Sequence, residues 1–201
     1  MNLFTAEEYG ALAPLFRPDY PGYRPTVLER PNGDQHTDVG KRYLHVALKY
    51  TPPGHWAHAY LARAHFEACR VAEAMGVPDA FYPRVTDGTL RVLDYPAGVG
   101  SAEHTDFDLF TIHCYRSHPD DFQRLDRVDP TLEAIDPDVH LGELAEHLGL
   151  GKATRHRVPA RPYTQQAIVY FAIPSHSTRL PGGLTVGEWL KERMTRSLVY
   201  T

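Results

Sequence analysis

The feature that most constrains the fold is a series of short β-type segments in the second half of the chain. They are rich in β-branched and aromatic residues, and turn residues separate them. Several short strands at such spacing are typical of a β-sandwich or barrel. The 17 prolines, scattered through the 201 residues, also favour short strands and turns over a helical bundle. The predicted strands of this half are residues 90–95, 109–115, 153–158 and 167–173.

Two helices are predicted beside these strands. Apolar residues at three- and four-residue steps predict a long helix over about residues 56–75, and Gly76 is suited to end it. Its expected apolar stripe consists of Tyr60, Ala64, Ala68, Val71 and Met75. Near the other end of the chain, Thr185 and Glu188 have the T-x-x-E spacing of a capping box, so a last helix should run from there to about Ser197. The expected fold class is therefore mainly β with flanking helices.

The chain is expected to form a single domain, residues 1–201, because it shows no internal repeat, low-complexity tract or linker and is long enough for a substantial core. Residues 1–87 should form an irregular and helical front region, with a short helix at about residues 6–13 and a strand at about residues 42–50. Residues 88–201 should form the β core and the last helix.

Composition argues against several kinds of partner. The net charge of −4 offers no electrostatic footprint for nucleic acid or an anionic membrane. No apolar run approaches the roughly 20 residues of a membrane span, and the first residues lack the pattern of a signal peptide. The two cysteines, Cys69 and Cys114, are expected to be buried free thiols. We therefore expect a cytoplasmic protein that binds neither nucleic acid nor membranes.

The motif that carries chemistry is His104-Thr105-Asp106, with His156 some fifty residues later. Side chains two residues apart in extended backbone point to the same side, so His104 and Asp106 can face one ligand. Two imidazoles and one carboxylate suit Fe(II) and leave open positions for substrate and oxygen. In one alternative, Asp106 caps a turn and the histidines, two of 12, are core or surface residues. In another, the same side chains hold a redox-silent metal such as Zn²⁺.

The surroundings of these residues resemble isopenicillin N synthase-like and plant-type 2-oxoglutarate/Fe(II) oxygenases. The resemblance covers about residues 88–201 and implies a double-stranded β-helix, a jelly-roll barrel with Fe(II) at its mouth. In it, His104, Asp106 and His156 would be the metal ligands. Four blocks carry the resemblance, in order: LRVLDYPAGVGSAEHTDFDLFT (90–111), DVHLGELAEHL (138–148), ATRHRV (153–158) and QQAIVYFAIP (165–174).

One motif of the family is not intact. Its Arg-x-Ser pair, which anchors the distal carboxylate of 2-oxoglutarate or a substrate carboxylate, would fall at Gln165 and Ala167, starting nine residues after His156. A neutral amide is a weaker partner for a carboxylate than the charged, bidentate fork of arginine. Tyr95 does match the co-substrate tyrosine of the family.

Three explanations of this departure remain open. Another cation could replace the arginine, and Arg157, Arg161 and Arg91 are candidates. The enzyme could instead take electrons from its own substrate, as some branches of the family do. It could also bind a different small acid or a neutral co-substrate. The candidate co-substrate residues are accordingly Tyr95, Gln165 and Arg161.

Two further residues are candidate substrate contacts. Asp108 stands where the family usually has a small residue, and it points to the same side as Asp106. It could bind a substrate amine or cation, or it could orient a ligand histidine. Phe107 could stack on a substrate or pack in the core. His113 and His140 match no ligand position and are interpreted as structural or as partners of the ligands.

The sequence thus predicts a non-haem Fe(II)-dependent oxygenase or oxidase that uses O2 on a small organic substrate, with 2-oxoglutarate as a candidate co-substrate. The alternative is a non-catalytic sensor or degenerate homologue that binds a metal or small acid on the same barrel. A hydrolytic zinc enzyme would need a general base beside the metal, and Glu103 should point away from His104. The substrate, and the choice among hydroxylation, desaturation and ring closure, stay open.

Overall fold

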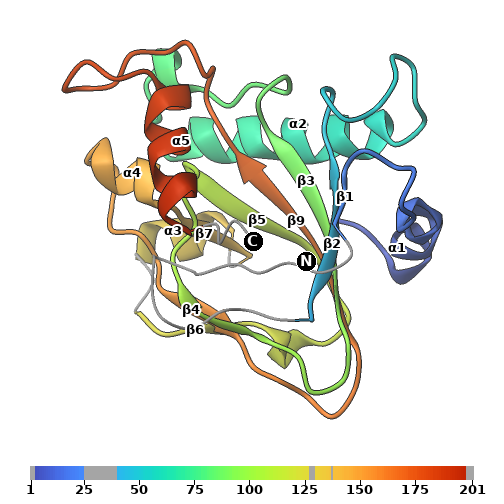
Figure 1. Ribbon diagram of the computed structural model, residues 1–201. Helices are drawn as coiled ribbons and strands as arrows, with labels where there is room; N and C mark the ends of the chain where they lie inside the picture. The colour runs from blue at the N-terminus through green and yellow to red at the C-terminus, as the bar shows by residue number, and fades with distance from the viewer. Residues whose placement is uncertain (1–2, 25–39, 127–129, 137, 198–201) are drawn as a thin grey trace.

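The computed structural model describes residues 3–24, 40–126, 130–136 and 138–197, and it consists of two antiparallel sheets with flanking helices (Figure 1). The predicted class, mainly β with flanking helices, is confirmed. The larger sheet joins, in order, β1 (Tyr23–Arg24), β2 (Arg42–Val46), β3 (Thr89–Tyr95), β9 (Gln165–Ala172), β5 (Phe110–Arg116) and β7 (Val139–Leu141). The smaller sheet joins β4 (Ser101–His104), β8 (His156–Val158) and β6 (Gln123–Arg124). The helices are α1 (Ala6–Leu12), α2 (His58–Ala74), α3 (Pro130–Ile135), α4 (Glu143–His147) and α5 (Val186–Ser197), with 3-10 turns at Ala13–Leu15, Asp79–Phe81 and Pro119–Asp121.

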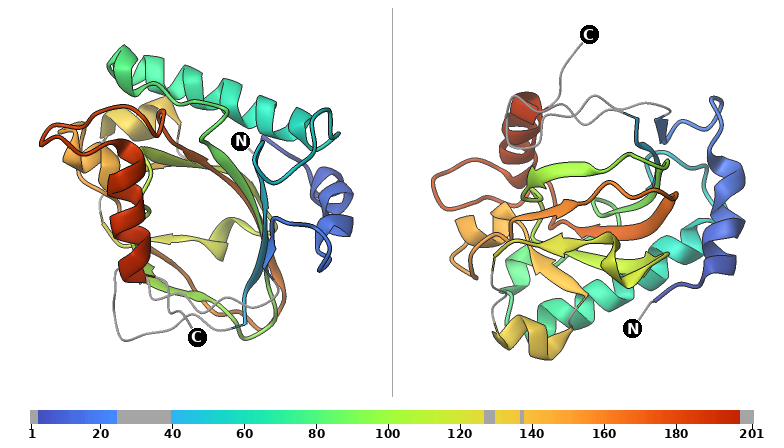
Figure 2. Two further views of the ribbon diagram at one scale, coloured as in Figure 1. Left: turned by 45° about the horizontal axis from the view of Figure 1, so that its top comes forward. Right: turned by 90° about the horizontal axis from the view of Figure 1, so that it is seen from below.

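The two faces of the larger sheet bury different side chains. On β3, Leu90 and Val92 belong to the main hydrophobic core, which also contains the buried face of α2. Arg91, Leu93 and Tyr95 alternate with them and so point to the opposite face. Leu93 and Tyr95 belong there to a second, smaller cluster. Helix α2 covers one face of the larger sheet, and the smaller sheet lies on the other side (Figure 2).

The long helix is confirmed, and it ends one residue before the predicted limit. Gly76, with φ of +66°, stands just past its C-terminus in the left-handed conformation that glycine adopts without strain. Tyr60 and Met75, which we expected in the apolar stripe, are only half-buried. The side chains that α2 buries are Leu61, Ala64, Ala68, Val71 and Ala72.

The last helix starts as its capping box predicts. The backbone N–H of Glu188 donates to the Thr185 hydroxyl at 3.2 Å, and the Thr185 N–H donates to the Glu188 carboxylate at 2.8 Å. Helix α5 then brings Leu190, Lys191 and Met194 to the wall of the cavity described below.

Two predicted strands are shorter in the structure. Strand β2 stops at Val46 because the chain turns there, with the Tyr50 N–H donating to the Ala47 carbonyl at 2.9 Å. Strand β8 begins only at His156. The preceding Ala153 and Thr154 instead use their N–H groups on the Glu146 carboxylate and the Leu141 carbonyl, at 2.8 and 2.9 Å. Strands β4 and β6, of four and two residues, were not predicted.

The front region takes part in the same sheet as the rest of the chain. Strand β2 pairs with β3 over five residues, from Arg42 opposite Asp94 to Val46 opposite Leu90. Residues of this region therefore reach the interior face of the larger sheet.

The remaining fold-level expectations concern cysteines and membranes. Neither cysteine is in a disulfide; Cys114 is buried as predicted, whereas Cys69 is half-buried. Within the described ranges, no helix has both the length and the apolar character that crossing a membrane requires.

Candidate metal centre

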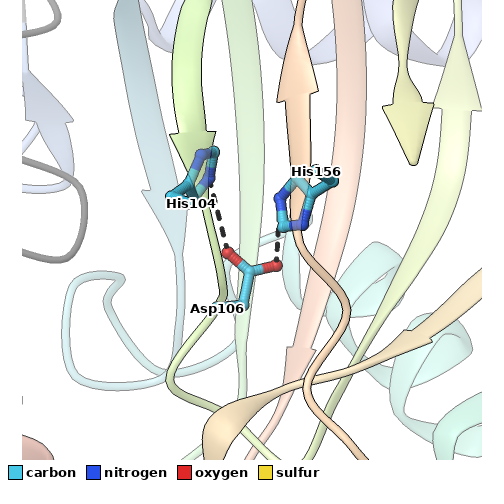
Figure 3. Close-up of side chains that lie close together, drawn as sticks. All are labelled: His104, Asp106 and His156. Carbon is cyan, nitrogen blue, oxygen red and sulfur yellow. Dashed lines mark ion pairs between the residues drawn. The ribbon is translucent and has the colours of Figure 1, made fainter. Parts of the chain in front are cut away.

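The smaller sheet brings the three predicted metal ligands together. His104 is the last residue of β4, His156 is the first residue of β8, and the two face each other in the strand register. Asp106 follows in the loop after β4. One ligating atom of each residue lies within 4.8 Å of the others, and the side chains converge on one point (Figure 3). The arrangement can hold a metal ion on one triangular face.

Both imidazoles are oriented by the backbone. His104 Nδ1 lies 2.7 Å from the Ala102 carbonyl, and His156 Nδ1 lies 3.0 Å from the Thr154 carbonyl. A carbonyl oxygen can only accept, so each Nδ1 carries the proton and each Nε2 presents its lone pair. The Nε2 atoms of His104 and His156 are 3.8 and 3.9 Å from the Asp106 carboxylate oxygens. The donor atoms therefore face a shared position.

Two further side chains hold the carboxylate of Asp106. The Thr111 hydroxyl donates to Oδ2 at 2.5 Å, and His140 Nε2 lies 2.9 Å from the same oxygen. Burial alone would raise the pKa of Asp106, but His156, His140 and His104 lower it well below its usual range. Asp106 therefore stays ionised, as a metal ligand must.

Burial keeps three histidines at this centre neutral. It lowers the pKa of His156 and of His140 to about 4, and it lowers the pKa of His113 well below its ordinary value. The Phe122 ring lies among them, with ring centroids 4.0 Å from His113, 5.3 Å from His140 and 5.0 Å from His156. These rings pack together beside the triad. They also agree with the interpretation of His113 and His140 as structural residues or partners of the ligands.

Asp108 is a buried acid beside the centre. It is 2% exposed, and burial together with the charge of Asp106 raises its pKa well above the usual value. Its carboxyl lies 3.0 Å from the Thr111 hydroxyl. The Thr111 hydroxyl therefore lies between the carboxyl groups of Asp106 and Asp108. This geometry favours an orienting role for Asp108, exerted on Asp106 through Thr111.

A cavity of about 770 Å³ adjoins the triad, and residues of both sheets and of α5 line it. Phe107 lines this cavity and also packs against the main core, so both of its predicted roles agree with its position. The apolar part of the wall includes Leu93, Val169, Phe171, Ile173 and Leu190.

The structure separates the predicted co-substrate residues. Tyr95 and Gln165 are opposite each other on β3 and β9, and both line the cavity. Arg161 is absent from the cavity lining among the described residues, and its guanidinium donates to the Asp120 carbonyl at 2.7 Å. Arg157 likewise turns to the Gln123 side-chain carbonyl at 2.9 Å. Of the three candidate cations only Arg91 lines the cavity, with its guanidinium carbon over two aromatic rings.

Sequence reasoning missed Thr111 and Lys41. Thr111 closes the first motif block, but a threonine in a strand carries no signal that it will support a ligand five residues earlier. Lys41 belongs to the front region, and the pairing of β2 with β3 brings it to the cavity wall.

Comparisons with known proteins identify the fold. No family model and no curated protein matches this sequence. A candidate oxygenase from Shewanella oneidensis is 20% identical with a TM-score of 0.65, covering 97% of this chain and 86% of its own. A full-length Neurospora crassa protein, solved in complex with alpha-KG, is 19% identical with a TM-score of 0.63, covering 94% and 80%. The rice dioxygenase for auxin oxidation is 16% identical with a TM-score of 0.53, covering 95% and 76%. The fold of this chain is therefore that of oxygenases and dioxygenases, in agreement with the family that its motifs resemble.

Proposed function

We propose that the protein is a non-haem Fe(II)-dependent oxygenase that acts on a small organic molecule with 2-oxoglutarate as co-substrate. The observation that carries this proposal is the preorganised triad: two imidazoles tied through Nδ1 to backbone carbonyls, and a carboxylate kept ionised by its neighbours. The cavity beside it offers room for small molecules. The alpha-KG bound to the Neurospora crassa protein supports the choice of co-substrate.

The proposal includes the finer architecture. The two antiparallel sheets on either side of the cavity are interpreted as the two halves of a double-stranded β-helix, and the likeness to oxygenase structures supports this. We also propose one domain over residues 1–201. The main core supports it, because one connected hydrophobic cluster contains residues from Phe4 to Leu190.

The residues present fit Fe(II) better than a hydrolytic zinc ion. Two neutral imidazoles and a carboxylate on one face are the ligand set of non-haem iron sites with open positions. A zinc hydrolase would need a base beside the metal, and Glu103 is exposed and paired with Arg155 at 2.7 Å instead. When bound, Fe(II) and 2-oxoglutarate together would supply the activation of O2 for oxidation of a C–H bond.

The protein's own part is binding and orientation. His104, Asp106 and His156 would hold the metal, while Thr111 and His140 keep the carboxylate in place. The apolar wall formed by β3, β9 and α5 would bind the substrate and exclude water from the site. A wall of this kind recognises a small, largely apolar body, and charged groups at its edges set its orientation.

Anaerobic titration with Fe(II) and then 2-oxoglutarate tests the proposal. We expect one iron per chain and a visible charge-transfer band that saturates as 2-oxoglutarate is added. Asp106→Ala and His156→Ala should lose the iron, whereas His147→Ala, at an exposed histidine, should bind it like the wild type. Iron binding without a band would reject the co-substrate and favour a 2-oxoglutarate-independent oxidase or a sensor. Equal iron binding by all variants would reject the triad.

A further inference from the structure

The cavity has a polar end near Gln165, and Gln165 itself offers no donor there. Its side chain is 1% exposed, and Nε2 donates to the Val99 and Pro159 carbonyls at 3.2 and 2.9 Å. These two bonds use both protons of the amide. Only its oxygen remains, and an oxygen repels a carboxylate. Ala167, two residues on, has no polar side-chain atom, so donors for an anionic ligand must come from other residues.

Lys41 and Ser101 supply such donors at the same end of the cavity. The register places Arg42 opposite Asp94 and Tyr95 opposite Gln165. If the pairing of β2 with β3 continues by one residue, Lys41 lies beside Tyr95. Lys41, Tyr95 and Gln165 then form a row across three neighbouring strands. Lys41 and Ser101 are 4% and 5% exposed, Lys41 Nζ lies 3.4 Å from the Ser101 hydroxyl, and both residues line the cavity.

We infer that Lys41 and Ser101 form a carboxylate-binding subsite that anchors the distal acid group of the 2-oxo diacid. This inference rests on the proposed function. An ammonium group has three protons, so Lys41 can engage Ser101 and a ligand carboxylate together. The pair is buried, so little water screens its attraction for the anion. A cation with a hydroxyl beside it is a donor set that suits a carboxylate.

The separation between this subsite and the triad suits a short diacid. Ser101 begins β4 opposite Val158, and His104 ends it opposite His156. The two ends of this four-residue strand are roughly 10 Å apart. A ligand whose 2-oxo acid end binds the metal would therefore present a second acid group, a few carbons away, to Lys41.

The other cations of the cavity are less suited to this task. The Arg91 guanidinium lies over the Tyr43 and Phe171 rings, 4.4 and 4.7 Å from their centroids, on the apolar wall. Arg116 is bound to the Asp138 carboxylate. Arg24, Lys49 and Lys191 are exposed to solvent, where water screens their charges. Lys41 combines burial, a neighbouring hydroxyl and a place at the polar end.

The test compares two ligands that differ only at the distal end. Binding of 2-oxoglutarate and of 2-oxovalerate, which has the same 2-oxo acid end and no second carboxylate, is measured by calorimetry on the anaerobic Fe(II) protein. We expect Lys41→Met to weaken 2-oxoglutarate binding roughly 10- to 100-fold and to change 2-oxovalerate binding by less than about twofold. Iron affinity should not change. Lys41→Arg should recover part of the preference.

Matched variants decide the assignment. Lys49→Met removes another lysine from the same cavity and should keep the full preference for 2-oxoglutarate. Ser101→Ala should lose part of it, and this variant serves if Lys41→Met does not fold. The inference is overturned if Lys41→Met retains the preference or if Arg91→Met abolishes it. Equal weakening of both ligands would mark Lys41 as structural. Wild-type protein that binds iron but not 2-oxoglutarate would reject the co-substrate in the proposed function as well.

Discussion

Thr111 links two buried acids whose pKa values are shifted in opposite directions. Its hydroxyl donates to Asp106 at 2.5 Å and lies 3.0 Å from the Asp108 carboxyl. The charge of Asp106 adds to burial in raising the pKa of Asp108. Thr111 therefore supports the ligand Asp106 directly and contacts the second acid beside it.

The first prediction concerns this hydroxyl. Thr111→Val keeps the shape of the side chain but removes the donor to Asp106, so we expect metal affinity to fall roughly 10- to 100-fold. Stability should fall by about 1–3 kcal/mol, because buried acceptors lose a partner. Thr111→Ser, which keeps the hydroxyl, should restore most of the affinity. Calorimetric titration with Fe(II) measures it, and an unchanged value for Thr111→Val would contradict the role given to Thr111.

At the scale of elements, the close approach of the β7–α4 corner to the loop after β4 holds this part of the site. The Leu144 N–H donates to the Asp108 carbonyl at 3.1 Å, and the Glu143 N–H donates to the Asp106 carbonyl at 2.8 Å. Gly142 stands between β7 and α4, and a Cβ there would collide with the carbonyl and carboxyl oxygens of Asp108. The glycine is needed for space, since its φ of −96° is open to other residues.

A matched pair of glycine substitutions tests this contact. Gly142→Ala should destabilise the protein by about 1–3 kcal/mol and weaken metal binding, because the backbone of Asp108 must move. Gly10→Ala, in α1 with open space around it, should stabilise the protein by roughly 0.5–1 kcal/mol. Urea denaturation gives both values. A Gly142→Ala protein as stable as the wild type would show that the corner can shift freely.

At the scale of the whole molecule, the metal site connects stability to ligand binding. The triad joins β4 to β8, and β8 also pairs with β6, so the metal site is connected to all three strands of the smaller sheet. A metal that binds only the folded chain must stabilise it.

We therefore expect Fe(II), added anaerobically at about 100 times its dissociation constant, to raise the free energy of unfolding by about 2.7 kcal/mol. Asp106→Ala should remove this gain, and His147→Ala should keep it. The measurement is chemical denaturation with and without metal. An equal gain in Asp106→Ala would show that the metal acts at other sites.

The buried tyrosines make the whole molecule sensitive to alkali. Burial raises the pKa of Tyr20 to about 12, and its hydroxyl donates to the His45 carbonyl at 3.2 Å. Burial also raises the pKa values of Tyr9 and Tyr170. An exposed tyrosine has a pKa of about 10, so the unfolded chain loses these protons first as pH rises. The stability that they contribute is complete below about pH 10 and is lost above it.

For Tyr20 this loss amounts to at most about 3 kcal/mol between pH 10 and 12. Tyr20→Phe should therefore lower stability by roughly 0.5–1.5 kcal/mol at pH 8, through the lost hydrogen bond, and reduce the decline above pH 10. Denaturation curves at pH 8, 10 and 11 measure both effects. An identical decline in the variant and the wild type would contradict this account of Tyr20.

The sequence by itself determined what depends on neighbours along the chain. The period of apolar residues in α2, the Thr185–Glu188 capping box and the two-residue spacing of His104 and Asp106 are all local, so they were predictable. The third ligand came from the motif around His156. Each of these patterns predicts which side chains share a face, because helices and strands repeat side-chain directions over a few residues.

Only the tertiary structure decided which distant residues meet. Lys41 joins the cavity because β2 pairs with β3, and His140 reaches Asp106 from 34 residues away. Arg161, a predicted co-substrate residue, donates to the Asp120 carbonyl instead. Asp120 is 41 residues away in the sequence, so no local pattern predicts this contact. Strand register and loop packing result from contacts across the whole chain. Strand register and loop packing therefore decide which residues surround the triad, whereas the triad itself could be predicted from the sequence.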